Sequence, residues 1–183
     1  MKTTDQLSRE HQAILRGLDL LKAAAASWRK YQAGAAEDCR ALVEFFKTFA
    51  DHCHHGKEEQ VLFPKLMQAG ITIHGRTLGV MLQEHEQGRD LIRGMEQALD
   101  ATRPSEFAFY ANRYARLLGE HIAKEDDILF KSAEGVLTGD EDEALLSRFD
   151  EIEREMGEDT HERFHHMLDT LASRYSPKPA KAS

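Results

Sequence analysis

The chain has 183 residues, of which 41% are hydrophobic and 31% are charged, and its formal net charge is −8. This balance is typical of one folded domain and excludes a disordered segment, which carries fewer hydrophobic residues for its charge. The negative charge, with no long basic run, gives no electrostatic basis for nucleic acid or an anionic membrane as a partner.

Four prolines and long segments without glycine or proline favour helices over a β-sandwich with its frequent turns, so we predict an all-α fold. Charged residues run through the N-terminal segment, and we therefore expect neither a signal peptide nor a membrane-spanning helix. Cys39 and Cys53 form no C-x-x-C pair, which favours two reduced thiols. We expect a cytoplasmic protein that is a monomer or a weak homodimer.

The first two predicted helices span residues 4–31 and 37–67. In the first, apolar residues recur at alternating spacings of four and three, and His11 lies within this stripe. That spacing predicts one buried face, so a histidine occupies a core position. We expect Pro64 to bend or end the second helix.

The third and fourth predicted helices span residues 76–100 and 104–133. His85 lies in the apolar stripe of the third. The stripe of the fourth helix contains His121 and Glu125. Polar side chains are therefore expected in the interior of both helices.

The last predicted helical segment spans residues 140–175 and is interrupted by Gly157, so it is either one kinked helix or two short ones. We predict a single domain over residues 1–175, with a core bundle at about 4–135 and the last segment as an additional C-terminal helix. Residues 176–183 are expected to form a frayed tail.

An internal repeat relates the second and fourth helices. Residues 54–63 read H-H-G-K-E-E-Q-V-L-F, and residues 121–130 read H-I-A-K-E-D-D-I-L-F. The first and third helices also resemble one another, with E-H-Q at 10–12 and E-H-E at 84–86. The chain therefore carries the order H, H-x-x-x-E, H, H-x-x-x-E.

This order predicts a metal site in the bundle interior. Residues four apart on a helix lie on one face, so each H-x-x-x-E presents an imidazole and a carboxylate to the same point. Burying so many ionisable groups unpaired would cost several kcal/mol each, and a bound cation offsets that cost. The predicted ligands are His11, His54, Glu58, His85, His121 and Glu125.

Neighbouring side chains compete for the assignment on the second helix. The phase of a regular helix places His54 and Glu58 on the shoulder of the apolar stripe and places His52, His55 and Glu59 on the opposite side. We therefore choose His54 and Glu58 as ligands.

The predicted donors are nitrogen and oxygen atoms only, which suits iron, manganese or zinc. The segment 52–55, which contains Cys53, suggests zinc when it is taken alone, but no second cysteine lies nearby at zinc-site spacing. Carboxylates that can bridge, set among imidazoles in a bundle core, favour a pair of ions. Six protein ligands on two octahedral ions leave positions for water, an oxo bridge or a small ligand such as dioxygen, hydrogen peroxide or nitric oxide.

With these residues in place, the sequence resembles the hemerythrin-like, HHE cation-binding family. The resemblance rests on D-H-C-H-H-G-K-E-E at 51–59 and H-I-A-K-E-D at 121–126, and it covers residues 5–135. It implies an up-and-down four-helix bundle around a non-heme diiron centre with an oxo or hydroxo bridge. It carries over the same six ligands.

Two features depart from the oxygen-carrying members of that family. Those members use a second histidine one turn from the one on the third helix, where this chain has Met81 and Arg89. They also use an aspartate five residues after the last histidine, whereas Glu125 comes four after. An ion with vacant positions favours reaction with an oxidant over reversible transport.

Three functions follow as hypotheses. The first is a diiron oxidoreductase that reacts with dioxygen, hydrogen peroxide or nitric oxide. The second is a sensing or oxygen-binding module without turnover, and the third is a metal-free structural bundle. We favour the enzyme.

Further candidates lie outside the repeat. His161 lies near the stripe of the last segment, and we include it as an extra metal ligand. Tyr110 and Tyr114 precede His121 on one stripe, where a phenol either packs or donates a hydrogen bond to a bound ligand. A ferritin-like diiron protein is the alternative, and such proteins need Glu-x-x-His on two helices. Here this motif occurs only in the last segment, so the sequence disfavours that alternative.

Overall fold

The computed structural model describes residues 2–76, 78–157 and 159–175. Within these residues the chain is helical, apart from loops and one isolated β-bridge between Ile73 and Arg76, so the predicted all-α class is confirmed. The expected tail, 176–183, lies outside the described residues. No helix among those described is both long and apolar enough to cross a membrane.

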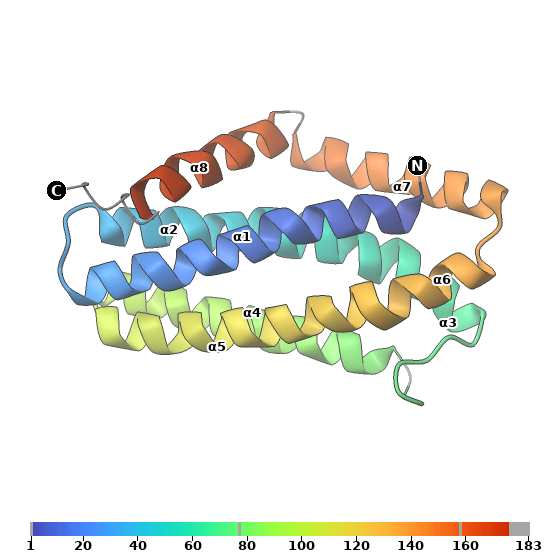
Figure 1. Ribbon diagram of the computed structural model, residues 1–183, viewed down its shortest axis with the longest axis horizontal. Helices are drawn as coiled ribbons and strands as arrows, with labels where there is room; N and C mark the ends of the chain where they lie inside the picture. The colour runs from blue at the N-terminus through green and yellow to red at the C-terminus, as the bar shows by residue number, and fades with distance from the viewer. Residues whose placement is uncertain (1, 77, 158, 176–183) are drawn as a thin grey trace, which may run out of the picture.

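The helices in chain order are α1 (Thr3–Arg29), α2 (Ala35–Phe45), η1 (Phe46–His55), η2 (Glu58–Leu62), α3 (Phe63–Gln68), α4 (Gly79–Asp100), α5 (Pro104–Lys124), η3 (Glu125–Leu129), α6 (Phe130–Val136), α7 (Gly139–Met156) and α8 (Thr160–Tyr175). The three η segments are π-helical. Each continues the helix before it, so α2 to α3 form one long rod and α5 to α6 form another (Figure 1).

Four rods pack side by side in a ring. Helix α1 contacts α2 and α5, and α4 contacts the same two helices from the other side. Short connections reverse the chain between successive rods, so neighbours run antiparallel (Figure 1). The expected up-and-down four-helix bundle is therefore confirmed.

The C-terminal segment forms two helices, α7 and α8, that lie along one side of the bundle (Figure 1). Helix α8 packs against α1, and α7 packs against α1, η1 and η2. Gly157 ends α7 with a φ of 99°, which L-residues with a side chain rarely adopt. Of the two alternatives expected for this segment, the pair of short helices is the one that forms.

The second rod contains two π-helical stretches. The π-helices η1 and η2 carry i→i+5 hydrogen bonds, and each shifts the face that the following side chains present. Pro64 does not end this rod, which continues to Gln68, because the proline falls in the first turn of α3.

The apolar core is divided into two clusters by a polar layer. One cluster lies towards the α8 end and contains Phe46, Ile92 and Leu118; the other contains Leu7, Leu62 and Leu129. Every bundle rod passes from one cluster to the other through a short buried stretch of histidine and glutamate: His11, His54, His55, Glu58, His85, His121 and Glu125. These seven side chains are at most 3% exposed, so dry apolar layers enclose them from both ends.

Close packing of α1 against the second rod generates a first prediction. A Cβ at Gly17 would meet Phe45 Cε1 at 2.7 Å and Phe46 Cζ at 3.2 Å, whereas a Cβ at Gly119 on α5 meets no atom within 4 Å. Gly17→Ala should therefore lower the free energy of unfolding by about 1–3 kcal/mol through overpacking. Gly119→Ala should raise it by about 0.5–1 kcal/mol because alanine favours a helix. Urea unfolding of the metal-free variants measures both, and equal changes would contradict this packing.

Candidate metal centre

Two groups of buried donors meet at the middle of the bundle. The donor atoms in each group all lie within 4.8 Å of one another. The first group is His55, Glu58, His85 and His121, and the second is His11, His54, Glu58 and Glu125. All six residues that the repeat predicts as ligands are therefore brought together, and Glu58 belongs to both groups.

Glu58 lies between histidines of different rods. Its Oε1 is 3.5 Å from His54 Nε2, and its Oε2 is 3.5 Å from His85 Nε2. One oxygen therefore faces each group, so Glu58 is placed to contribute a donor atom to both.

Glu125 repeats this arrangement from the fourth rod. Its Oε2 is 3.3 Å from His11 Nε2, and its Oε1 is 3.2 Å from His121 Nε2. His121 Nε2 also lies 2.9 Å from His85 Nε2. Two imidazole nitrogens at that distance either share one proton or point their lone pairs at one electrophile.

Most of these atoms have no hydrogen-bond partner among the described residues. The orphaned buried atoms are His11 Nε2, His55 Nε2, both carboxylate oxygens of Glu58, both of Glu125, and the hydroxyl of Tyr114. An unsatisfied buried polar atom costs about 1–3 kcal/mol, and more when it is charged. Six of the seven belong to the two donor groups, so cations at their centres would satisfy nearly the whole set.

The outer nitrogen of each histidine is fixed by a carboxylate. The Nδ1 contacts are His11 to Asp126 at 2.9 Å, His54 to Glu10 at 2.8 Å, His55 to Asp51 at 3.3 Å, His85 to Glu59 at 2.7 Å and His121 to Glu84 at 2.8 Å. A proton on Nδ1 donated to the carboxylate leaves the Nε2 lone pair directed inward. Histidines that ligate metals are oriented in this way.

The supporting contacts follow the internal repeat. The glutamate before His11, Glu10, supports the histidine of the second rod, and Glu84 before His85 supports that of the fourth. The lysine of each motif then binds the same glutamate: Lys57 donates to Glu10 at 2.5 Å, and Lys124 donates to Glu84. The lysine in both copies of H-x-x-K-E therefore holds a carboxylate in place.

The ends of the two motifs also have matching roles. The acidic residue after each glutamate ligand, Glu59 or Asp126, accepts from a histidine of another rod. The final phenylalanine of each motif stacks on that histidine. Phe63 lies 5.8 Å from His85 and Phe130 lies 5.4 Å from His11 between ring centroids. Sequence reasoning missed these roles, although their signal was present in the repeat.

The expectation that His55 projects away from the site is wrong. His55 is 3% exposed, and its ring stacks on that of His85 with centroids 3.8 Å apart. The expectation assumed the phase of a regular α-helix, but residues 46–55 form the π-helix η1, whose wider turn brings both His54 and His55 inward. His52 remains exposed, as expected.

Arg89 explains how one departure from the family pattern is accommodated. It occupies one of the two positions, with Met81, that lie one turn from His85, and its guanidinium binds Asp51 at 2.8 Å and Glu59 at 2.7 Å. Those carboxylates support His55 and His85. Arg89 thus holds in place the carboxylates that orient His55 and His85.

Electrostatics divide the histidines into two kinds. Burial alone would lower the pKa of His11, but the hydrogen bond to Asp126 and the nearby charge of Glu125 outweigh burial and raise the pKa to about 9. The pKa of His121 also rises to about 9, because its contacts with Glu125 and Glu84 outweigh burial. The two imidazolium charges in turn hold the pKa of Glu125 well below its usual value despite its burial.

The remaining donors are held neutral. Burial lowers the pKa of His54 to about 4, and burial with the nearby His85 lowers that of His55 well below its usual value. Burial, reinforced by repulsion from Glu125, raises the pKa of Glu58 well above its usual value. Without a cation, the centre can therefore hold one of its two inner carboxylates charged and the other protonated.

His161 does not join either group of four. It lies on α8, and its Nε2 is 3.8 Å from Cys53 Sγ and 4.0 Å from Glu153 Oε1. These three residues form a separate group of possible metal donors.

The two tyrosines lie against neighbouring helices. The ring of Tyr110 lies where a Cβ of Gly94 would come within 2.8 Å of three of its atoms. Tyr114 is 1% exposed, and its ring meets that of Phe46 edge to face at 5.0 Å. Tyr110 therefore packs closely on α4, whereas the buried hydroxyl of Tyr114 has no partner within the part of the chain that the structure describes.

Comparisons with known protein sequences identify the family. A sequence model of the hemerythrin HHE cation-binding domain matches residues 2–133. Uncharacterized proteins of Mycobacterium bovis and Mycobacterium tuberculosis are 29% identical over 164 residues, covering 84% of this chain and 62% of theirs. The chain thus spans about three fifths of the length of these relatives, and no solved structure matches it. Since the family match covers most of the chain, the protein belongs to the hemerythrin HHE cation-binding family.

Proposed function

We propose that this protein is a non-heme diiron oxidoreductase that binds and reduces a small oxidant, with hydrogen peroxide or dioxygen as its substrate. One observation carries the proposal. Inward-facing imidazole nitrogens and two carboxylates converge on two adjacent points, and each carboxylate directs one oxygen towards each point. Nitric oxide, which is of similar size and also binds iron, is a further ligand for the same centre.

The donor set supports iron. Imidazole and carboxylate suit iron, manganese or zinc, but zinc has no redox chemistry with which to reduce an oxidant. The absence of a thiolate among the donors argues against a cluster of the iron–sulfur kind. We assign one ion to His55, His85 and His121 and the other to His11 and His54, with Glu58 and Glu125 shared. His161 falls outside this assignment because its ring meets Cys53 and Glu153 instead.

The two ends of the centre differ in the number of donors. The repeat places Ile122 where the second rod has His55, and the Ile122 side chain is 3% exposed. The ion beside His11 and His54 therefore receives fewer nitrogen donors than its neighbour. We assign the position of the exogenous oxidant to this less crowded ion.

Residues around the centre control what enters it. Leu7, Phe46 and Phe130 are buried in the apolar clusters on either side, so they exclude bulk water and large substrates. The outer carboxylates keep the imidazoles in one orientation while the charge of the centre changes. The residues thus favour a small, neutral oxidant over an organic substrate.

A pair of iron ions held by these residues would supply two-electron redox chemistry, and one hydrogen peroxide takes up two electrons and two protons to give two waters. A second hydrogen peroxide returns two electrons and two protons as it becomes dioxygen. The disproportionation therefore balances without any other reactant. Reduction of dioxygen would need an external reductant.

Turnover is the direct test of this proposal. Iron-loaded protein should release dioxygen from hydrogen peroxide, measured with an oxygen electrode over many equivalents per chain. His121→Ala removes a ligand and should lower the rate by at least the roughly 10–100-fold that loss of a supporting carboxylate costs. Glu120→Ala changes an exposed neighbour and should leave the rate unchanged.

Stable, reversible binding of dioxygen with no turnover of peroxide and no net reduction of dioxygen would contradict the enzyme and favour a sensing or oxygen-binding module.

The inward position of His55 generates a second prediction. His55→Ala should reduce bound iron from two ions per chain towards one, because the ion near His85 and His121 loses a nitrogen donor. His52→Ala, three residues before it and exposed, should retain both ions. Elemental analysis of the two purified variants measures the ratio, and equal iron content would show that His55 is not a ligand.

Proton release provides a third prediction. His11 and His121, with pKa values of about 9, carry protons at pH 7 in the metal-free protein. Metal ligation at Nε2 must displace them, so binding should release at least two protons per chain at pH 7. Affinity should therefore rise as pH increases towards 9.

Calorimetric titration with Fe(II) under nitrogen, repeated in buffers of different ionisation enthalpy, counts these protons. Binding without proton release, or affinity that falls between pH 6 and pH 9, would contradict the assignment of these two histidines.

A further inference from the structure

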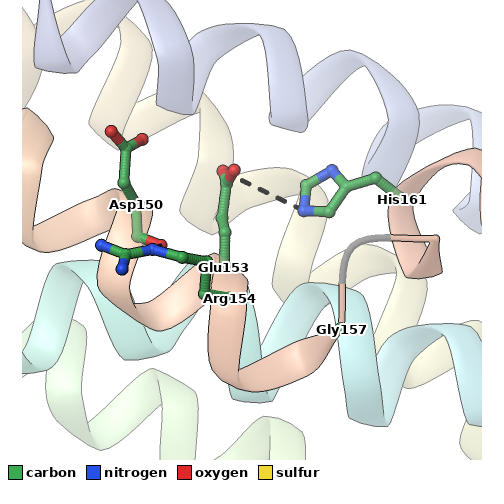
Figure 2. Close-up of a pocket in the computed structure, with 5 residues that line it drawn as sticks. All are labelled: Asp150, Glu153, Arg154, Gly157 and His161. Carbon is green, nitrogen blue, oxygen red and sulfur yellow. Dashed lines mark hydrogen bonds and ion pairs between the residues drawn. The ribbon is translucent and has the colours of Figure 1, made fainter.

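A second group of metal-ligating side chains lies beside the bundle core, under α7 and α8. His161 Nε2 is 3.8 Å from Cys53 Sγ and 4.0 Å from Glu153 Oε1, and the donor atoms of all three lie within 4.8 Å of one another. In Figure 2 the His161 ring points across towards the Glu153 carboxylate. The three donors therefore already face a common point.

These donors come from three different elements. Cys53 lies on η1 and is 1% exposed, whereas the side chains of Glu153 on α7 and His161 on α8 are 31% and 29% exposed. A cavity of about 400 Å³ opens beside them, lined by Glu153, His161, Asp150, Arg154 and Gly157 (Figure 2). The group is therefore closed by the bundle on one side and open to an added ligand on the other.

The charged side chains around these donors carry an excess of negative charge. Lys57 is fully buried and joins Glu10 at 2.5 Å to Glu153 at 2.6 Å. Two carboxylates thus share one ammonium, and a thiolate at Cys53 would add a second excess negative charge. A divalent ion would neutralise that excess. Glu153 Oε1 accepts from both Lys57 and Gln6, so the carboxylate can ligate an ion through Oε2 and keep both contacts.

We propose that Cys53, Glu153 and His161 bind one divalent ion of the zinc type, separate from the pair of ions at the bundle centre. Zinc accepts sulfur at about 2.3 Å and nitrogen or oxygen at about 2.0–2.2 Å in a tetrahedral arrangement, so its ligand atoms lie roughly 3.5 Å apart. The observed separations are 3.8 and 4.0 Å from His161 Nε2 and at most 4.8 Å between Cys53 and Glu153, so the three side chains must close around the ion. The fourth position faces the cavity and takes water.

Such an ion would link α7 to α8 beyond Gly157, where α7 ends. It would fix the end of α7 to the start of α8 and both to η1, the segment that carries His54 and His55. On binding, the Cys53 thiol gives its proton to solvent and its sulfur ligates the ion. The proposed role is a clamp that stabilises the wall of the neighbouring centre.

Cobalt(II) is the probe that separates this site from the other. A thiolate bound to cobalt gives an intense near-ultraviolet charge-transfer band, and neither group of donors at the bundle centre contains sulfur. Titration of the iron-loaded protein with cobalt(II) should therefore produce this band, saturating at one equivalent per chain. Zinc(II) added afterwards should remove it.

Two variants and one control identify the ligands. Cys53→Ser should abolish the band. His161→Gln, which changes a partly exposed residue, should weaken cobalt binding at least tenfold while leaving the iron content unchanged. Cys39→Ser alters the other buried free cysteine and should retain the band.

Absence of the band in the unmodified protein, its persistence in His161→Gln with unchanged affinity, or its loss in Cys39→Ser would each overturn the site. Because the readout is a sulfur–metal band, it stays independent of whether the iron centre turns over peroxide.

Discussion

The hydrogen bond from each inner histidine to a carboxylate is the interaction on which the structure depends. Five imidazoles each present Nδ1 to an acidic side chain at 2.7–3.3 Å, and that contact directs Nε2 into the bundle. Inward lone pairs and two further carboxylates are costly in a dry core unless a cation satisfies them. The polar middle layer thus lowers the stability of the metal-free bundle. The apolar clusters at both ends offset that loss.

The helix geometry at this layer also directs donor atoms into the bundle. A regular α-helix presents one residue in each turn to the interior, which suits the single histidines of α1 and α4. The second rod presents three donors, His54, His55 and Glu58, and it does so through π-helical turns. Such turns are often found at functional sites, because they re-aim side chains at the cost of weaker packing.

Much of this arrangement could be predicted from the sequence because the repeat is periodic. The spacing of His54 and Glu58, and of His121 and Glu125, predicted their shared face, and the structure brings them together. His55 could not be predicted in this way, since its direction depends on the π-helix η1, which tertiary packing selects. Four of the five supporting carboxylates serve a histidine on a different rod, and they were missed because only the folded bundle pairs them. Asp51 supports His55 on its own rod, and it was missed together with the inward direction of His55.

The central claim is that two ions lie side by side between the rods and share Glu58 and Glu125. Crystals of the iron-loaded protein, measured above and below the iron absorption edge, test it most directly. The account predicts two anomalous peaks about 3.5–4 Å apart, one beside His85 and His121 and the other beside His11 and His54. A single peak, or iron bound away from these side chains, would contradict it.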